Sequence, residues 1–215
     1  MQPITVTVGP LAAASATAIC ASQTPSAGAL TINGSAATGG VATLDTARRV
    51  LITCAGNESG KTFTITGTNY NGKTQTETLA GPNATTVQSV LDYKTITSVS
   101  ISANAAGAVT VGTNGVASSR WVYVDSWAFA EVNIMCDVSG TVNYTVQKTL
   151  ENPNDPTNPI AAANVSWVNS KDSTLVSANS TIVGLDYTAS FYKVTINSGT
   201  GSVTATIMQN GAVPF

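Results

Sequence analysis

The chain has 215 residues, of which 43% are hydrophobic and only 9% are charged, and its formal net charge is −2. Soluble domains usually carry about 25% charged residues, so Thr, Ser, Asn, Gly and Ala must form most of this surface. Apart from Arg48 and Arg49 the basic residues are scattered singly, which argues against nucleic-acid binding, and no apolar run reaches the ~18 residues of a membrane span.

The N-terminal segment, residues 1–24, is low in charge and rich in Ala and Thr. It lacks the charged-then-apolar pattern of a signal peptide, so we expect a protein made in the cytoplasm and used without secretion. The segment predicts either an arm that reaches a neighbouring subunit or the ordinary first one or two strands of the first sandwich.

The remainder of the chain predicts strands and turns, with almost nothing helical. Short runs rich in Val, Ile, Thr and aromatic residues recur, and Gly, Asn, Pro or Ser interrupt them about every ten residues, as in a β-sandwich or barrel. The clearest candidate strands are residues 49–54, 62–69, 73–80, 95–102, 108–111, 120–129, 132–138, 141–149, 190–197 and 201–208.

Strict alternation in several of these runs predicts one buried and one polar face. The buried positions in this interpretation are Phe63, Ile65, Val99 and Ile101, followed later by Tyr144, Val146, Val194 and Ile196. Asn71-Gly72 lies between two such runs and predicts a hairpin, because both residue types tolerate positive φ.

The chain also resembles itself. VLITC ending at Cys54 is followed by Gly60 and Phe63, and VNIMC ending at Cys136 is followed by Gly140 and Tyr144. A second landmark, Leu-Asp-Tyr, occurs at 91–93 and at 185–187 in the same order relative to later strands, and the loop 151–164 accounts for the extra length of the second copy.

We therefore predict an all-β protein of two tandem β-sandwich domains, jelly-roll or immunoglobulin-like, that arose by internal duplication. The expected domains are residues 1–115 and 116–215, with a polar linker at 113–119.

No catalytic, cofactor-binding or metal-binding residue is predicted, and we expect no enzyme activity or cofactor. The chain has no histidine, and its acidic residues are spread without a repeated metal-ligand spacing. Asp92 and Asp186, in the two Leu-Asp-Tyr landmarks, are expected to hydrogen-bond turn backbone. Cys20, Cys54 and Cys136 are expected to be small core residues rather than nucleophiles, because no cation lies beside them in sequence.

Aromatic residues leave two alternatives open. Trp121, Tyr123 and Trp127 alternate in one run and Trp167 follows later, which suits either a sugar-stacking platform or a core or subunit interface. The loop 152–159 could bind calcium weakly, although its prolines favour a stiff surface loop.

Two stretches resemble β-rich domains of structural proteins of tailed bacteriophages. The first contains FTITGTNYNGKTQTETLAGPN and YKTITSVSISANAAGAVTVG; the second contains TVNYTVQKT, Trp167 and INSGTGSVTATIMQ. The resemblance covers most of the chain beyond about residue 45 and implies a virion component, with no catalytic residue to carry over.

Among virion components, we expect a capsid decoration or cement protein. It would bind the major capsid protein or other virion proteins of the assembled shell, as a homo-oligomer with a trimer favoured over a dimer. A neck or tail accessory protein, a fibre protein and a carbohydrate-binding β-sandwich module are the alternatives.

Overall fold

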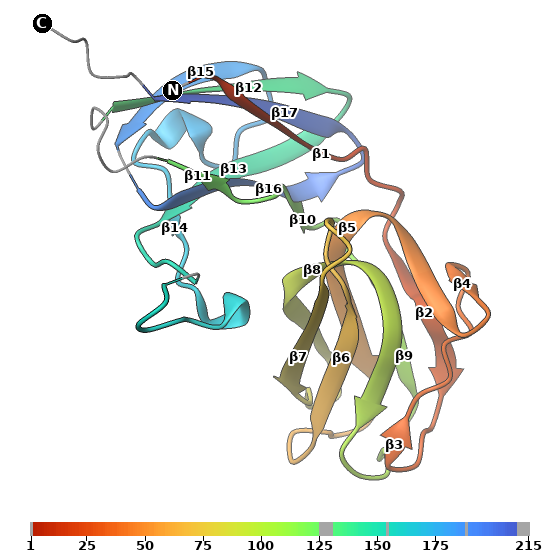
Figure 1. The fold of residues 1–215 in the computed structure, drawn as a ribbon. Helices are drawn as coiled ribbons and strands as arrows, with labels where there is room; N and C mark the ends of the chain where they lie inside the picture. Colours follow the sequence, from red (N-terminus) through yellow and green to blue (C-terminus); the bar gives the residue numbers. More distant parts are fainter. Residues whose placement is uncertain (1, 125–130, 154, 188, 210–215) are drawn as a thin grey trace, which may run out of the picture. The chain divides into compact units, whose positions relative to one another are not determined.

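The computed structural model describes residues 2–124, 131–153, 155–187 and 189–209. It confirms the all-β class, because nearly all the regular structure is antiparallel strand and the described helices are two short 3-10 turns, η1 (Ala162–Asn164) and η2 (Ser173–Leu175). The chain forms two compact units, drawn in Figure 1. We call Ala12–Gly115 the continuous unit, and Met1–Leu11 together with Val116–Phe215 the split unit.

This division corrects the expected one at the N-terminus. The second unit does begin at Val116, but the first eleven residues belong with it and not with residues 12–115. The continuous unit is therefore inserted between the first and second strands of the split unit. A period-2 pattern shows that a strand is half buried, but it does not identify the sheet that the strand joins.

The split unit has two sheets, ordered β1-β17-β12-β15 and β10-β16-β13-β14, and β11 also pairs with β16. Its strands are β1 (Ile4–Val8), β10 (Ala117–Ser118), β11 (Val122–Tyr123), β12 (Glu131–Ser139), β13 (Val142–Thr149), β14 (Val168–Asn169), β15 (Ile182–Tyr187), β16 (Phe191–Gly199) and β17 (Ser202–Gln209). Figure 1 shows β12 and β17 in one layer and β13 and β16 in the other, as in a sandwich.

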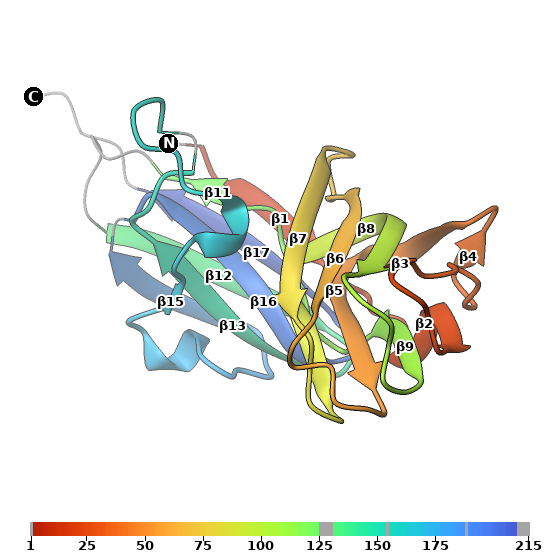
Figure 2. The ribbon, with the colours of Figure 1, turned by 90° about the horizontal axis from the view of Figure 1, so that it is seen from below.

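The continuous unit has one sheet, ordered β2-β9-β5-β8-β6-β7, with β3 added beside β8 and β4 beside β5. Its strands are β2 (Ser15–Gln23), β3 (Gly28–Ala29), β4 (Ala37–Thr38), β5 (Val41–Cys54), β6 (Thr62–Thr68), β7 (Thr74–Ala80), β8 (Thr86–Ile101) and β9 (Val109–Thr113). Figure 2 shows β6 and β7 as neighbours. Both β5 and β8 are interrupted by register shifts, and the sheet encloses its own apolar core.

The two units share a plan of strand pairing. In the continuous unit, β5 pairs with β9 and with β8 from Thr86 to Ile96, while β6 pairs with β7 and with β8 from Thr95 to Ile101. In the split unit, β12 pairs with β17 and β15, while β13 pairs with β14 and β16. In the split unit, β15 ends at Tyr187 and β16 begins at Phe191, whereas β8 continues as one strand. Its ladder with β5 is shifted in register between Arg49 and Leu51, and we call this stretch the bend of β8.

The cross-strand register agrees in one layer and is displaced in the other. Phe63 lies opposite Ile101 as Tyr144 lies opposite Ile196. Cys54, however, lies opposite Val109, whereas Cys136 lies opposite Ala205 and not opposite Val203. Common descent of the two units remains a prediction.

The expected core positions are confirmed. The residues predicted to face inwards are buried, and they divide between two separate apolar clusters, Phe63, Ile65, Val99 and Ile101 in one and Tyr144, Val146, Val194 and Ile196 in the other. The hairpin at Asn71-Gly72 is also confirmed, between β6 and β7. Only Gly72 has a positive φ there, and the Asn69 side chain closes the loop by accepting the backbone N–H groups of Asn71 and Lys73.

Candidate functional site

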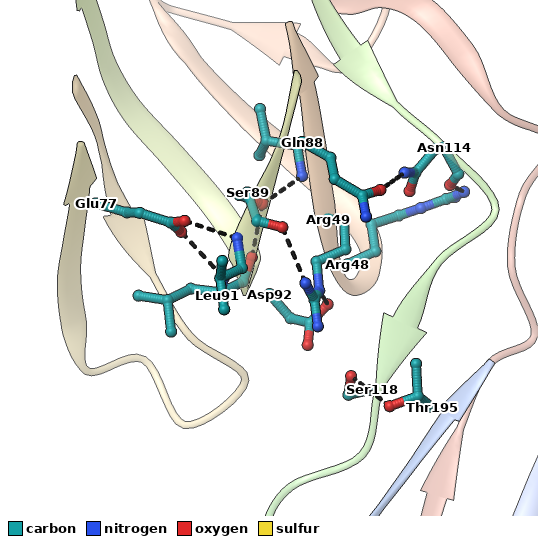
Figure 3. Close-up of polar contacts among 12 residues, drawn as sticks. Arg48, Arg49, Glu77, Gln88, Ser89, Leu91, Asp92, Asn114, Ser118 and Thr195 are labelled. Atoms are coloured by element: carbon teal, nitrogen blue, oxygen red, sulfur yellow. Dashed lines mark hydrogen bonds and ion pairs between the residues drawn. The ribbon is translucent and has the colours of Figure 1, made fainter. Parts of the chain in front are cut away.

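Asp92, the first of the two landmark aspartates, belongs to a polar cluster at the bend of β8 (Figure 3). The Arg49 guanidinium donates from Nε to Asp92 Oδ1 at 3.1 Å and from Nη1 to the Ser89 carbonyl at 2.9 Å. Arg49 therefore joins β5 to both sides of the bend, and Asp92 takes part through an ion pair with Arg49.

Two further side chains hold the bend. Ser89 Oγ accepts the Val50 N–H at 2.9 Å and donates to the Leu91 carbonyl at 2.7 Å. The Glu77 carboxylate, which is 5% exposed, accepts the N–H groups of Val90 at 2.6 Å and Leu91 at 3.0 Å (Figure 3). Buried backbone groups need such partners wherever a ladder is interrupted, so this cluster is structural.

Asp186, the second landmark aspartate, is fully buried in the split unit. Lys148 Nζ lies 2.5 Å from Asp186 Oδ1, and the carboxylate also accepts the N–H groups of Lys171 at 3.3 Å and Tyr187 at 2.7 Å. The expectation that Asp186 would hydrogen-bond nearby backbone is confirmed. Its lone pairs are engaged by the fold, as a buried carboxylate requires.

Arg48 forms a site that the sequence did not predict. Its side chain is 1% exposed, and it donates from Nη1 to the Ala12 carbonyl at 2.9 Å and from Nη2 to the Asn114 carbonyl. Asp45 pairs with Arg48 at 3.2 Å and accepts the Ala12 N–H at 2.6 Å. Burial alone would raise the pKa of Asp45, but the Ala12 hydrogen bond and the Arg48 charge outweigh it and lower that pKa.

Because Ala12 and Asn114 lie at the two ends of the continuous unit, Arg48 fastens its start to its end. Asn114 also donates from Nδ2 to Gln88 Oε1 at 2.5 Å (Figure 3). The adjacent pair Arg48 and Arg49 was the only sequence signal, and it does not distinguish a structural clamp from a surface charge.

The three cysteines are free thiols in the cores, as expected. Burial raises the pKa of Cys20 to about 12 and that of Cys136 to about 11. Burial, reinforced by the negative charge of Glu58, raises the pKa of Cys54 to about 11. A thiol with such a pKa is almost wholly protonated near neutral pH and is a poor nucleophile.

Three of the four aromatic residues singled out in the sequence come together in the split unit, and Trp127 lies outside the described residues. The Trp121 ring meets Trp167 edge-to-face at 5.0 Å and Phe191 at 6.0 Å, and Tyr123 meets Phe191 at 5.6 Å. Lys193 Nζ lies 4.2 Å from the centre of the Trp167 ring. The rings pack against one another and a cation lies over one of them, which favours the core or interface alternative over a sugar-stacking platform.

The loop 152–159, for which weak calcium binding was the less favoured alternative, uses the Asp155 carboxylate within the loop. Asp155 accepts the N–H groups of Thr157 at 2.8 Å and Asn158 at 3.0 Å. Within the residues that the structure describes, no cluster of three or more His, Cys, Asp or Glu side chains could hold a metal ion. The same part of the chain contains no helix long and apolar enough to cross a membrane.

The strongest candidate for function is an apolar surface on the split unit. Strand β15 turns Ile182, Gly184 and Asp186 inwards and Val183, Leu185 and Tyr187 outwards. This is the reverse of what hydrophobicity predicts, because a Gly and an Asp face the core while the larger apolar side chains face solvent.

Two local contacts explain why β15 buries Gly184 and Asp186 and exposes its neighbours. Gly184 approaches the η2 turn so closely that an added Cβ would lie 2.6 Å from Asp172 Oδ2 and 2.7 Å from the buried Leu175 side chain. The ion pair of Asp186 with Lys148 fixes the next inward position. Sliding β15 by one residue would bury Val183 and Leu185, but it would remove both contacts.

Neighbouring strands extend this surface. Met135 of β12 lies directly opposite Val183, and Asn133 lies between Leu185 and Met208 of β17. The members are 38–69% exposed, and we call them the outer patch: Met135, Val183, Leu185, Tyr187 and Met208. Threonines adjoin it, since Thr206 lies opposite Met135. Charged groups adjoin it at Tyr187, since Glu131 lies opposite this residue and Lys171 Nζ lies 4.8 Å from the centre of its ring. An exposed group of apolar side chains with a polar border is typical of a protein-binding surface.

Comparison with protein-family models, with curated proteins and with solved structures found no match. The candidate site therefore rests on the geometry of this chain.

Proposed function

We propose that the protein is a non-catalytic structural subunit of a bacteriophage particle that decorates the assembled capsid and binds its shell protein through the outer patch. The phage assignment comes from the sequence resemblance. The observation that carries the binding role is the inverted strand β15, which exposes Val183 at 69% and Leu185 at 42% while Asp186 is buried.

The remainder of the surface supports contact with a neutral protein partner. Exposed strand faces carry cross-strand threonine pairs, such as Thr64 with Thr78 at 3.1 Å and Thr66 with Thr76 at 3.2 Å. Burial of hydroxyl and apolar side chains costs less desolvation free energy than burial of charges. Many such contacts on a symmetric shell would add through multivalency.

The test is add-back of purified protein to particles made without it, with bound copies and the temperature of DNA release as readouts. Val183→Asp places a charge in the outer patch and should abolish binding, while its unfolding midpoint stays close to that of the unchanged protein because position 183 is exposed. Leu150→Asp is the matched control: it replaces another exposed apolar side chain of the split unit, 79% exposed and outside the outer patch, with the same charge, and should bind normally.

Equal binding by the two variants would exclude the outer patch as the contact. Binding at a single vertex would favour the neck or tail alternative. Binding to soluble glycans that is lost with Trp121→Ala would favour the carbohydrate-binding alternative.

A further inference from the structure

Strand β1 is an edge strand of the split unit, but the next hundred or so residues of the chain, 12–115, form the continuous unit. Ile4 lies opposite Ile207 and Val8 opposite Val203, yet the residue that follows Leu11 already belongs to the continuous unit. The chain returns to the split unit only at Val116. The corresponding edge in the continuous unit, that of β9, is filled by β2, which lies in the same uninterrupted stretch of chain.

The contribution of β1 to its unit is large and contains no charge. Val6, Val8 and Leu11 are 4%, 2% and 3% exposed, and all three belong to the core of the split unit. Thr5 and Thr7 face outwards and pair with Thr206 at 3.3 Å and Thr204 at 3.1 Å. Without β1, the edge of β17 would be open beside an apolar slot, which is a hazard that folded proteins avoid.

The segment after β1 separates it cleanly from the continuous unit. Ala12 is held there by Asp45 and Arg48, while Ala12, Ala13 and Ala14 are all exposed and outside any strand. Residues 1–11 therefore fill one edge of the split unit and are connected to the continuous unit only through the short exposed segment 12–14. A strand connected in this way can pair with β17 of another copy and bury the same side chains in the core of that copy.

We propose that β1 is exchanged between copies, so that the β1 strand of one chain completes the split unit of a second chain. The partner is a second copy of this protein, and the site is the edge of β17 with the slot for Val6, Val8 and Leu11. Because exchange preserves the β1 contacts, protein concentration decides between the closed and the exchanged forms. The proposal does not depend on the particle assignment, since it concerns the purified protein alone.

Cysteine pairs placed across β1 and β17 test the exchange. Thr5→Cys is made in one chain and Thr206→Cys in a second chain that carries a size tag; the two are unfolded together, refolded at high concentration and then oxidised. We expect a covalent heterodimer that disappears on reduction. The pair Thr7→Cys and Thr204→Cys should behave in the same way, because these residues are also directly opposite.

Two controls make every outcome decisive. Thr5→Cys mixed with Thr78→Cys measures random collision, because Thr78 is exposed but lies on β7. A single chain carrying both Thr5→Cys and Thr206→Cys must form the disulfide when dilute, which shows that the two thiols can react when β1 is in place. Exchange predicts heterodimer from the matched mixtures and none from the mismatched one. Only closed monomers at every concentration, or equal heterodimer from matched and mismatched mixtures, would overturn the proposal.

Discussion

The two units follow the same pairing plan but join their strand layers differently. In the continuous unit, β8 runs on through a bend that Ser89, Glu77 and Arg49 hold by hydrogen bonds to backbone. In the split unit, β15 ends at Tyr187 and β16 begins at Phe191, and the ion pair of Lys148 with the buried Asp186 lies at the end of β15. Because β15 is a strand separate from β16, the two need not share a register, and the register of β15 exposes Val183, Leu185 and Tyr187 of the outer patch.

Deleting residues 2–11 should have the largest effect, and it should act on one unit only. Loss of the buried side chains of Val6, Val8 and Leu11 removes about 1.5–3 kcal/mol each, in addition to the β1 hydrogen bonds. We expect the split unit to unfold. All three tryptophans, Trp121, Trp127 and Trp167, lie in this unit, so tryptophan fluorescence reports on it alone, while circular dichroism reports on both units.

The deletion variant should retain a cooperative circular-dichroism transition from the continuous unit. Loss of all cooperative unfolding would show that residues 12–115 do not fold independently of β1.

Lys148→Met should destabilise the split unit by about 3–5 kcal/mol, because it leaves the carboxylate of Asp186 buried without its cation. Arg49→Met should cost the continuous unit about 1–2 kcal/mol, since Asp92 is 15% exposed and keeps some contact with water. Urea titrations followed by fluorescence and by circular dichroism separate the two effects. Equal losses in the two variants would contradict the contrast between a buried and a partly hydrated pair.

Ser89→Ala should destabilise the continuous unit by about 1–3 kcal/mol, because the Val50 N–H and the Leu91 carbonyl lose their partner at the bend. Ser98→Ala is the control on the same strand, away from the bend, and should change stability little. The fluorescence transition should be unchanged in both variants. A smaller loss for Ser89→Ala than for the control would mean that the bend does not need this clamp.

The smallest expected effect is on thiol reactivity. Because burial raises the pKa values of Cys54 and Cys136 to about 11, the folded protein should resist alkylation at pH 8 and react fully only in denaturant. The unfolded thiols ionise near their ordinary value of 9.0, so this contribution to stability is present below pH 9 and is lost as the pH rises towards 11. Rapid labelling of one folded thiol, measured by mass spectrometry, would contradict its burial.

Alternation in the sequence predicted much of the fold, because inward positions such as Phe63, Ile65, Val194 and Ile196 follow directly from a period of two. Two features did not follow from it. The unit to which β1 belongs is decided by its pairing with β17, which lies about two hundred residues further along the sequence. The polarity of β15 is set by packing of Gly184 against Leu175 and by Lys148, so distant contacts override its local pattern.

We propose that this protein covers a particle shell in many symmetry-related copies and contacts it through the outer patch. The most direct measurement is the ratio of this protein to the major shell protein in intact purified particles, obtained by quantitative mass spectrometry with labelled standards. We expect a fixed small-integer ratio that corresponds to hundreds of copies, and loss of the protein from particles assembled with Val183→Asp. A copy number that fits a single vertex, or particles that retain Val183→Asp at the full ratio, would contradict it.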